Sequence, residues 1–458
     1  RGFEEYYGFT SGHWGHYFNA LMEHNRELTT GEGYITDDLT SHAIDFIKGH
    51  RGEPFFCYVP YNTPHSPMQV PDKWYEKFKD AELKMHNRDP EKEDRPHLLA
   101  ALAMCENIDW NVGRVLKTLK DLQLEDNTIV VYFSDNGPNG WRWNGDMKGR
   151  KGATDEGGVR SPLFVRWPGV IPAGTTVKPI AGAIDLLPTL ADLAGIPLIS
   201  KKPLDGISLK PVLTGQTNQL EDRLLMNHFG FHRQGPMRGQ PRISIRSQEY
   251  RLDEVNGLYH IPSDPGQRQN IAKQHPELVE SMVAARNKYI SEIAEELKED
   301  ERPFPIGYAT ITNLPARDGR PHGGVQRSGR APNCSFFQNW TGAADDSITW
   351  DVEVGTAGEY EVVILYTCPQ NDVGSTFEVR LNDAVMHGKV SEAHDPPLYG
   401  AESDRTPDRG SESYVKDFKP MSVGTIKLEK GTGVLTLKAL KVPGKTVMDV
   451  RMVRLFKK

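Results

Sequence analysis

The sequence predicts an α/β domain with a mainly parallel central sheet, followed by a C-terminal antiparallel β-sandwich domain. Two continuous apolar runs, at residues 55–59 and 129–133, are separated by an amphipathic helical pattern. After about residue 300 the helical patterns stop, and short segments of alternating polar and apolar residues replace them. We therefore divide the chain into a first domain, residues 1–302, and a second domain, residues 303–458.

The first two predicted strands are Phe-Phe-Cys-Tyr-Val at 55–59 and Ile-Val-Val-Tyr-Phe at 129–133. Continuous apolar runs of this length are typical of strands that are buried on both faces. Between them, apolar residues recur at steps of three and four from Leu98 to Leu119, which indicates one amphipathic helix. A strand, a helix and a strand in this order predict two parallel strands with a right-handed crossover.

Further elements of the first domain follow from local signals. A helix is expected to begin near Thr36, where two aspartates open an apolar-periodic segment. A second helix is expected from Asp185 to Ala194, because Gly195 stands where a helix commonly ends. The run Leu-Phe-Val at 163–165 predicts another strand.

The second domain shows the two-residue period of half-buried strands. The alternating segments are followed by Gly, Asn and Asp, which favour turns and indicate an antiparallel sandwich. They lie at 348–354, 360–365, 376–381 and 434–438. From about Ile306 the segment is similar to jelly-roll carbohydrate-binding modules, although an accessory domain without a ligand fits the pattern equally well.

Composition excludes several functional classes. The formal net charge of −7 argues against a nucleic-acid partner, because phosphate binding needs a basic surface. No apolar run approaches the ~20 residues that span a bilayer, so no membrane-spanning segment is expected. Four cysteines in 458 residues exclude a small disulfide scaffold.

Polar side chains follow the first two predicted strands. His65 lies just after the first strand, and Asp135 and Asn136 follow the second. If the strands are parallel, these residues meet at the carboxyl edge of the sheet, where ligands bind in open α/β folds. Asp135 and Asn136 offer oxygen ligands for Ca²⁺ or Mg²⁺, and His65 offers an acid or base. For each residue taken alone, an ordinary turn or loop is the better explanation.

Lys148 and Lys151 lie in a glycine-rich loop, where an ammonium group can approach an anionic oxygen closely. A solvated basic loop is the alternative.

Aromatic residues near these segments suggest sugar contacts. His13 and His16, ahead of the first helix, and Trp141, after the second strand, can stack on a sugar ring. For all three, local packing is the alternative.

Taken together, these segments resemble the later motifs of the type I, formylglycine-dependent sulfatases. The resemblance covers roughly residues 1–300, and several motifs occur in the family's order. The matching segments are 62–65 (Asn-Thr-Pro-His), 134–138 (Ser-Asp-Asn-Gly-Pro), 151–160 (beginning Lys-Gly-Ala-Thr-Asp-Glu-Gly-Gly), 167–169 (Trp-Pro-Gly), 184–190 (Ile-Asp-Leu-Leu-Pro-Thr-Leu), 257–259, 264–265 and Asn270.

The resemblance implies an alkaline-phosphatase-like α/β sandwich that hydrolyses sulfate esters of a sulfated carbohydrate. It implies a divalent cation, usually Ca²⁺ and less often Mg²⁺, with Asp135 and Asn136 as two of its ligands. His65 would contact the sulfate and help protonate the leaving oxygen. Lys151, rather than Lys148, would bind the sulfate and the bridging oxygen. A secreted or periplasmic location is also implied by the family.

One family feature is missing. The nucleophile is a Cys or Ser in a C/S-x-P-S-R motif, converted to formylglycine, and none of the four cysteines fits that pattern. They are Cys57, Cys105, Cys334 and Cys368. We therefore interpret the chain as a sulfatase without its N-terminal part, and expect no turnover by this chain alone. Missing strands would expose sheet edges, which leaves an oligomer open.

Two other functions stay open at this point. A phosphatase or phosphodiesterase of the same superfamily would hold zinc through several Asp and His ligands, whereas the Asp-Asn pair favours a hard cation. The absent nucleophile is also compatible with a non-catalytic glycan-binding protein.

Overall fold

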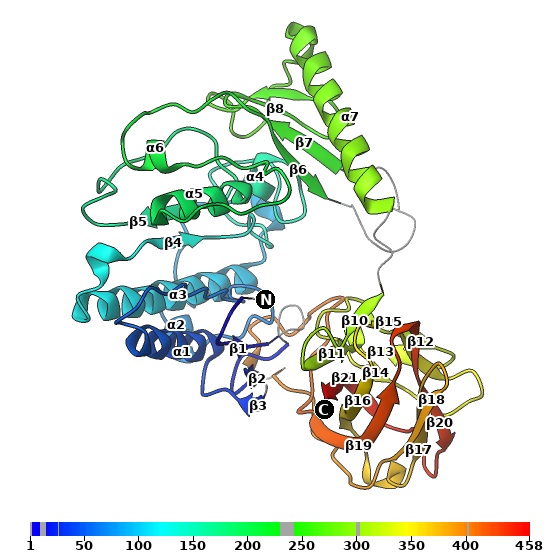
Figure 1. The fold of residues 1–458 in the computed structure, drawn as a ribbon. Helices are drawn as coiled ribbons and strands as arrows, with labels where there is room; N and C mark the ends of the chain where they lie inside the picture. The colour runs from blue at the N-terminus through cyan, green and yellow to red at the C-terminus, as the bar shows by residue number, and fades with distance from the viewer. Residues whose placement is uncertain (1, 10–14, 26, 230–241, 299–302, 401–402) are drawn as a thin grey trace.

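The computed structural model describes residues 2–9, 15–25, 27–229, 242–298, 303–400 and 403–458. Elements β1 to α7 form an α/β part, and elements β10 to β21 form a β-sandwich beside it (Figure 1). None of the helices in the described ranges is long and apolar enough to cross a membrane.

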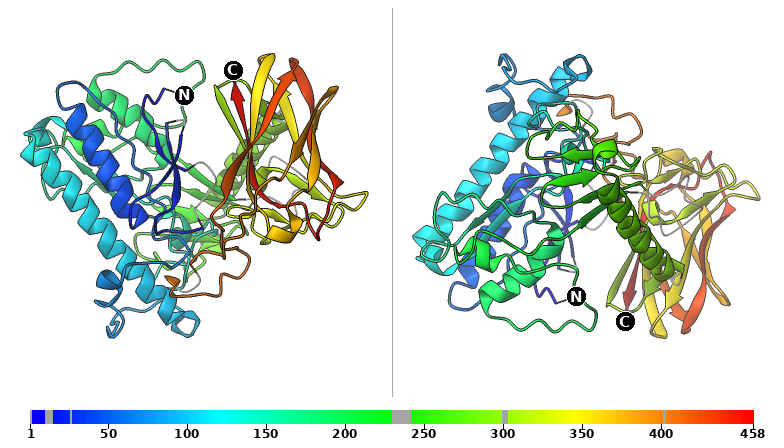
Figure 2. Two further views of the ribbon diagram at one scale, coloured as in Figure 1. Left: turned by 90° about the horizontal axis from the view of Figure 1, so that it is seen from below. Right: turned by 90° about the horizontal axis from the view of Figure 1, so that it is seen from above.

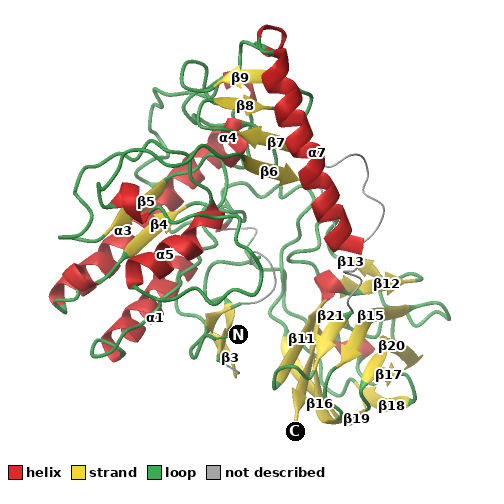
Figure 3. Ribbon diagram, turned by 45° about the horizontal axis from the view of Figure 1, so that its top comes forward, coloured by secondary structure: helices red, strands yellow, loops and turns green. Residues whose placement is uncertain are grey.

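The α/β part contains three groups of elements. The first group has a short sheet beside three helices: β1 (Tyr7–Gly8), β2 (Leu21–His24), β3 (Glu27–Thr30), α1 (Ile35–Gly49), α2 (Asp72–Tyr75) and α3 (Arg95–Asp121). The second has β4 (Val130–Phe133), α4 (Glu156–Val159), β5 (Leu163–Arg166), α5 (Leu186–Ala194) and α6 (Lys210–Leu213). In the third, α7 (Pro276–Lys298) packs on the antiparallel sheet of β6 (Leu225–Phe229), β7 (Arg242–Arg246), β8 (Tyr250–Leu252) and β9 (Leu258–His260) (Figure 3).

The predicted helices are confirmed. The stripe from Leu98 to Leu119 becomes α3, whose apolar face packs on α1. Helix α1 begins at Ile35, one residue before the predicted start. Helix α5 ends at Gly195, which adopts the left-handed conformation, with φ of 67°. That conformation is strained for residues with a Cβ, so glycine suits the position.

The pairing of the first two strands differs from the expectation. Residues 55–59 are extended but form no strand, and β4 pairs antiparallel with β5. The physical reason is a large cavity that separates 55–59 from β4 and prevents hydrogen bonds between them. The α/β class itself is confirmed, because strands β4 and β5 alternate along the chain with helices α3, α4 and α5.

The β-sandwich has two packed sheets with one apolar core, as the alternating segments predicted. Its sheets run in the orders β10-β15-β20-β17-β18 and β13-β14-β21-β16-β19, with only β10 and β15 parallel among the described pairs. The largest buried side chains of its core include Trp340, Trp350 and Phe377. The strands are β10 (Phe304–Ile306), β11 (Ile311–Pro315), β12 (Arg320–His322), β13 (Gln326–Arg327), β14 (Phe337–Gln338), β15 (Ser347–Val354), β16 (Gly358–Thr367), β17 (Thr376–Leu381), β18 (Ala384–Lys389), β19 (Lys419–Leu428), β20 (Gly431–Lys441) and β21 (Asp449–Lys457).

The chain between β18 and β19 leaves the sandwich and lies against the α/β part (Figure 2, orange). We call residues 390–418 the bridging loop. Its Asp404 forms an isolated β-bridge with Gln69, and its Arg405 forms an ion pair with Asp72. The two parts of the molecule are therefore joined by hydrogen bonds as well as by the connection after α7.

Candidate active site

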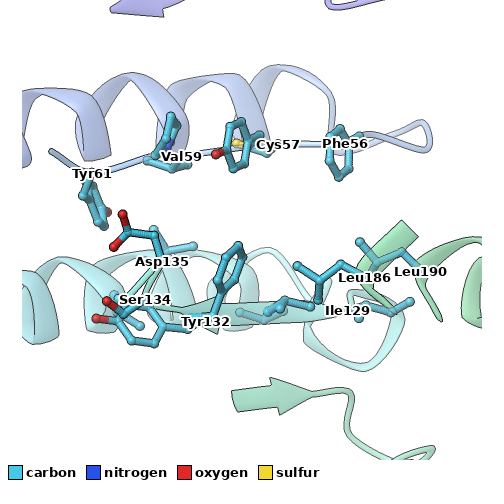
Figure 4. Close-up of a pocket in the computed structure, with 18 of the residues that line it drawn as sticks. Phe56, Cys57, Val59, Tyr61, Ile129, Tyr132, Ser134, Asp135, Leu186 and Leu190 are labelled. Carbon is cyan, nitrogen blue, oxygen red and sulfur yellow. The ribbon is translucent and has the colours of Figure 1, made fainter. Parts of the chain in front are cut away.

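A cavity of about 2730 Å³ lies between the extended segment 55–61 and β4. Apolar residues of α1, α3 and α5 contribute to its wall, and polar residues line it at 61–65 and after the end of β4. In Figure 4 the carboxylate of Asp135 projects from the end of β4 toward the segment that carries Tyr61. Four of the residues singled out from the sequence line this one cavity: His65, Asp135, Asn136 and Lys151.

Asp135 and Asn136 occupy a tight turn directly after β4. The next residue, Gly137, donates its backbone N–H to the carbonyl of Gly158 at 2.9 Å. A Cβ at Gly137 would lie only 1.9 Å from the carbonyl oxygen of Gly157, so no other residue fits here without a shift of the backbone. Because Gly137 has no side chain, the turn of Asp135 and Asn136 can pack closely against Gly157 and Gly158 of the loop that carries Lys151.

His65 is held by contacts from two directions. The hydroxyl of Tyr17 donates to the carbonyls of His65 at 3.0 Å and of Ser66 at 3.1 Å. Nδ1 of His65 lies 2.9 Å from the carbonyl oxygen of Ser66. Because a carbonyl oxygen only accepts, we assign a proton to Nδ1 in this contact. The backbone and the ring of His65 are therefore both fixed beside the cavity.

The loop of Lys151 explains why the two lysines differ. The backbone N–H of Lys151 donates to the carbonyl of Pro138 at 2.9 Å, which joins this loop to the turn after β4. Lys148 does not line the cavity; its Nζ lies 3.1 Å from Asp155 and 3.5 Å from Asp253. Burial opposes the charge of Lys148, but these carboxylates raise its pKa. Lys148 is therefore engaged in the structure, and Lys151 is the lysine at the cavity.

Buried charges anchor the loop of Lys151 to the β6–β9 sheet. Oε2 of Glu156 lies 2.9 Å from Arg251 and 3.5 Å from Arg246. The carbonyl of Thr154 accepts from Arg251 at 2.8 Å and from Ser244 at 2.5 Å. Through these contacts, Thr154 and Glu156 fix the loop of Lys151 to strands β7 and β8.

Of the two histidines expected to contact a sugar, only His16 is among the described residues, and it does not line this cavity. His13 lies outside the described residues. The ring of His16 stacks on Tyr399 of the bridging loop at 4.5 Å and is absent from the lining of the cavity.

Of the two tryptophans after β4, the cavity is lined by Trp143 and not by Trp141. Trp141 lies between the Lys92 ammonium at 4.7 Å and the Arg150 guanidinium at 4.9 Å, so it packs locally. Trp143 is 51% exposed. Trp143 is therefore the better candidate for stacking on a sugar.

The oxygen atoms available at this end of the cavity are of the type that binds hard cations such as Ca²⁺. Asp135 supplies a carboxylate and Asn136 an amide oxygen. Both amide atoms of Asn62, which also lines the cavity, are buried without a hydrogen-bond partner among the described residues. The described residues contain no cluster of three or more His, Cys, Asp or Glu of the type that holds zinc. Ca²⁺ takes about six to eight oxygens, so further ligands are needed to complete such a site.

Sequence comparison assigns these features to one family. A profile described as Sulfatase matches residues 1–196, and one described as N-sulphoglucosamine sulphohydrolase, C-terminal, matches residues 151–295. Together they cover more than half of the chain.

Individual proteins agree with the profiles. The chain is 28% identical to the uncharacterized sulfatase YdeN of Escherichia coli (strain K12), over 65% of this chain and 58% of that protein. It is 31% identical to N-acetylgalactosamine-6-sulfatase of Canis lupus familiaris, over 50% of this chain and 45% of that protein. The chain thus spans about half the length of these curated relatives.

Among solved structures, the chain resembles Ps i-CgsB in complex with k-i-k-neocarrahexaose. The TM-score is 0.55 and the identity 29%, over 63% of this chain and 66% of that one. The fold, the motifs in their order and the family profiles agree, and through residues 1–295 the chain belongs to the sulfatase family.

Proposed function

We propose that the protein to which this chain belongs hydrolyses sulfate esters of a sulfated glycan. The observation that supports this most strongly is that His65, Asp135, Asn136 and Lys151 line one cavity. Negative charge develops on the non-bridging and leaving oxygens of a sulfate ester during cleavage, and these groups suit that charge.

Each residue has a role in this proposal. Asp135 and Asn136 would hold a Ca²⁺ ion, which when bound would stabilise negative charge on the sulfate. The ammonium of Lys151 binds the sulfate and the bridging oxygen. His65 donates a proton to the leaving oxygen, which becomes the sugar hydroxyl. Trp143 stacks on the sugar ring at the rim of the cavity.

The nucleophile comes from outside residues 1–458 in this proposal. Cys57 lines the cavity, but burial and the nearby Glu5 raise the pKa of its thiol, which disfavours the thiolate that a nucleophile needs. Large apolar side chains around the cavity are exposed, including Phe56 at 64%, Tyr58 at 60% and Leu187 at 59%. A β-strand would cover them and bring a formylglycine and the remaining calcium ligands beside Asp135.

Sulfate release by the longer protein tests the proposal. A protein that carries the nucleophile strand should release sulfate from sulfated oligosaccharides, and Asp135→Ala and Lys151→Ala should each lower kcat/KM at least a hundredfold. Metal analysis should find Ca²⁺. Tightly bound Zn²⁺ with release of phosphate instead of sulfate would contradict the proposal and favour a phosphatase.

The similarity to N-acetylgalactosamine-6-sulfatase supports a glycan substrate but does not extend to the sugar itself. Export to the periplasm or the cell exterior is also part of the proposal, because the proposed substrate, a sulfated glycan, would be encountered there. Detection of the protein in the cytoplasmic fraction of its source cells would contradict this part.

A further inference from the structure

The bridging loop of the β-sandwich contacts the segment that carries His65. Ser66, the neighbour of His65, donates its hydroxyl to Oε2 of Glu412 in this loop at 2.7 Å. The same hydroxyl oxygen lies 3.2 Å from Nδ1 of His65. Glu412, which is 346 positions from Ser66 in the sequence, is thus separated from the cavity-lining imidazole of His65 by a single hydroxyl group.

Glu412 is itself held in place by a buried arginine. Nη2 of Arg409 lies 3.0 Å from Oε2 of Glu412, and the side chain of Arg409 is only 3% exposed. Nη1 of Arg409 donates to the carbonyl of Ser413 at 2.6 Å. The carboxylate that accepts from Ser66 therefore has a fixed position beside the charge of Arg409.

The backbone next to His65 is clamped by the same loop. The N–H of Met68 donates to Oδ1 of Asp404 at 3.2 Å, and the carbonyl of Met68 accepts from the N–H of Arg405 at 3.1 Å. The side chain of Gln69 donates to the carbonyl of Gly400 and to the hydroxyl of Ser403, each at 3.1 Å. Met68 and Gln69 are fully buried, so these bonds are sheltered from water.

We propose that the β-sandwich is part of the active site and that Glu412 is a positioning residue for His65. Glu412 withdraws the proton of the Ser66 hydroxyl toward itself, which makes the oxygen of that hydroxyl a better acceptor for Nδ1–H of His65. Together with the carbonyl of Ser66, which lies 2.9 Å from Nδ1, this hydroxyl keeps the proton on Nδ1, and Nε2 is the nitrogen that exchanges a proton with the substrate. This inference rests on the proposed role of His65, and it gives the sandwich a role other than independent sugar binding.

Histidine NMR on the chain of residues 1–458 tests the inference without any turnover. With ¹⁵N-labelled histidine, the variant His65→Gln identifies the two ring nitrogens of His65, whose shifts report which nitrogen carries the proton. We expect Glu412→Gln and Ser66→Ala to move these signals toward the form protonated on Nε2. Ser66→Thr retains the hydroxyl and should restore the original signals.

A matched control distinguishes an effect of Glu412 on the His65 ring from a general loosening of the contact between the sandwich and the α/β part. Asp72→Asn removes the ion pair with Arg405 at the same interface, but Asp72 is 82% exposed and does not contact His65. It should leave the His65 signals unchanged, and each variant is checked for folding by its thermal transition. Unchanged His65 signals in folded Glu412→Gln and Ser66→Ala, or an equal shift in Asp72→Asn, would overturn the inference.

In the active longer protein, Glu412→Gln should lower kcat about 10- to 100-fold with little change in KM, as expected for the partner of a catalytic group. If that protein releases no sulfate at all, the proposed function fails while the NMR result stands by itself.

Discussion

Glu156 and Arg251 form an ion pair of 2.9 Å in which both side chains are almost completely buried, 4% and 3% exposed. The pair joins the loop of Lys151 to β8, across 95 residues of sequence. Burial lowers the pKa of Arg251, and the charge of Glu156 counteracts that effect. The position of Lys151 at the cavity thus depends on a contact that involves no group of the cavity itself.

Removal of the charge on Glu156 should destabilise the fold strongly. We expect Glu156→Gln to lower the free energy of unfolding by about 3–5 kcal/mol, because Arg251 and Arg246 would remain buried without their counter-charge. Urea unfolding measures this. Glu254→Gln is the control: its contact with Arg242 is 3.9 Å long and exposed, so its cost should stay below about 1 kcal/mol. Equal costs for the two variants would contradict the prediction.

The turn after β4 should tolerate no side chain at Gly137. A Cβ there would overlap the carbonyl of Gly157, so we expect Gly137→Ala to cost about 1–3 kcal/mol or more and to displace Asp135. The matched control is Gly113→Ala in α3, where a Cβ meets nothing within 4 Å. That variant should stabilise the protein by about 0.5–1 kcal/mol, since alanine favours helix. Urea unfolding of both variants checks the sign of each effect. An unchanged free energy of unfolding for Gly137→Ala would contradict the prediction.

Asp185 should contribute stability that is lost in acid. Burial opposes its ionisation, but hydrogen bonds from Arg223 and from the backbone of Gly182 and Ile207 outweigh burial and lower the pKa of Asp185 below 3.8. A carboxyl with a lowered pKa in the folded state stabilises the fold above its ordinary pKa and loses that contribution as pH falls through the folded value.

We therefore expect Asp185→Asn to cost about 3–5 kcal/mol at pH 7, because it leaves Arg223 without its buried partner. The difference between the two proteins should shrink as pH falls below about 4. Unfolding by urea over a series of pH values measures it. A difference that stays constant down to pH 2 would show that the charge of Asp185 is not responsible.

The two tryptophans after β4 offer a paired test of the sugar site. Trp143→Ala should weaken binding of a sulfated oligosaccharide by roughly 3- to 10-fold, the loss of one aromatic stacking contact. Trp141→Ala should leave this affinity unchanged and lower stability instead, because Trp141 packs between Lys92 and Arg150. Calorimetric titration of the longer protein distinguishes the two, and the reverse pattern would contradict the assignment.

Local patterns predicted the elements better than their partners. The three-and-four spacing from Leu98 to Leu119 and the two-residue period of 348–354 each led to the observed α3 and β15, because periodicity reports which face is buried. The run 55–59 has the same apolar character as β4 but lacks a neighbouring strand. A strand needs a partner, and its own residues do not contain that information.

Only the site residues that lie in recognisable sequence motifs could be predicted. The order of the motifs around His65, Asp135 and Lys151 suggested one site, and these residues line one cavity. The contact between Ser66 and Glu412 could not be predicted, because it crosses from the α/β part to the sandwich and leaves no spacing pattern. For His16 the sequence did not reveal the neighbour: its aromatic-rich segment suggested a sugar contact, and in the structure its ring stacks on Tyr399.

The shared hydrogen bonds at Met68 and Gln69 have a practical consequence for protein engineering. A carbohydrate-binding module on a flexible linker can be exchanged for another, because nothing else depends on where it sits. Here, an exchange of the sandwich would remove two hydrogen bonds from the backbone of Met68 and two from the side chain of Gln69, close to His65. Chimeras of this protein should therefore retain residues 390–418 with the α/β part, wherever the rest of the sandwich comes from.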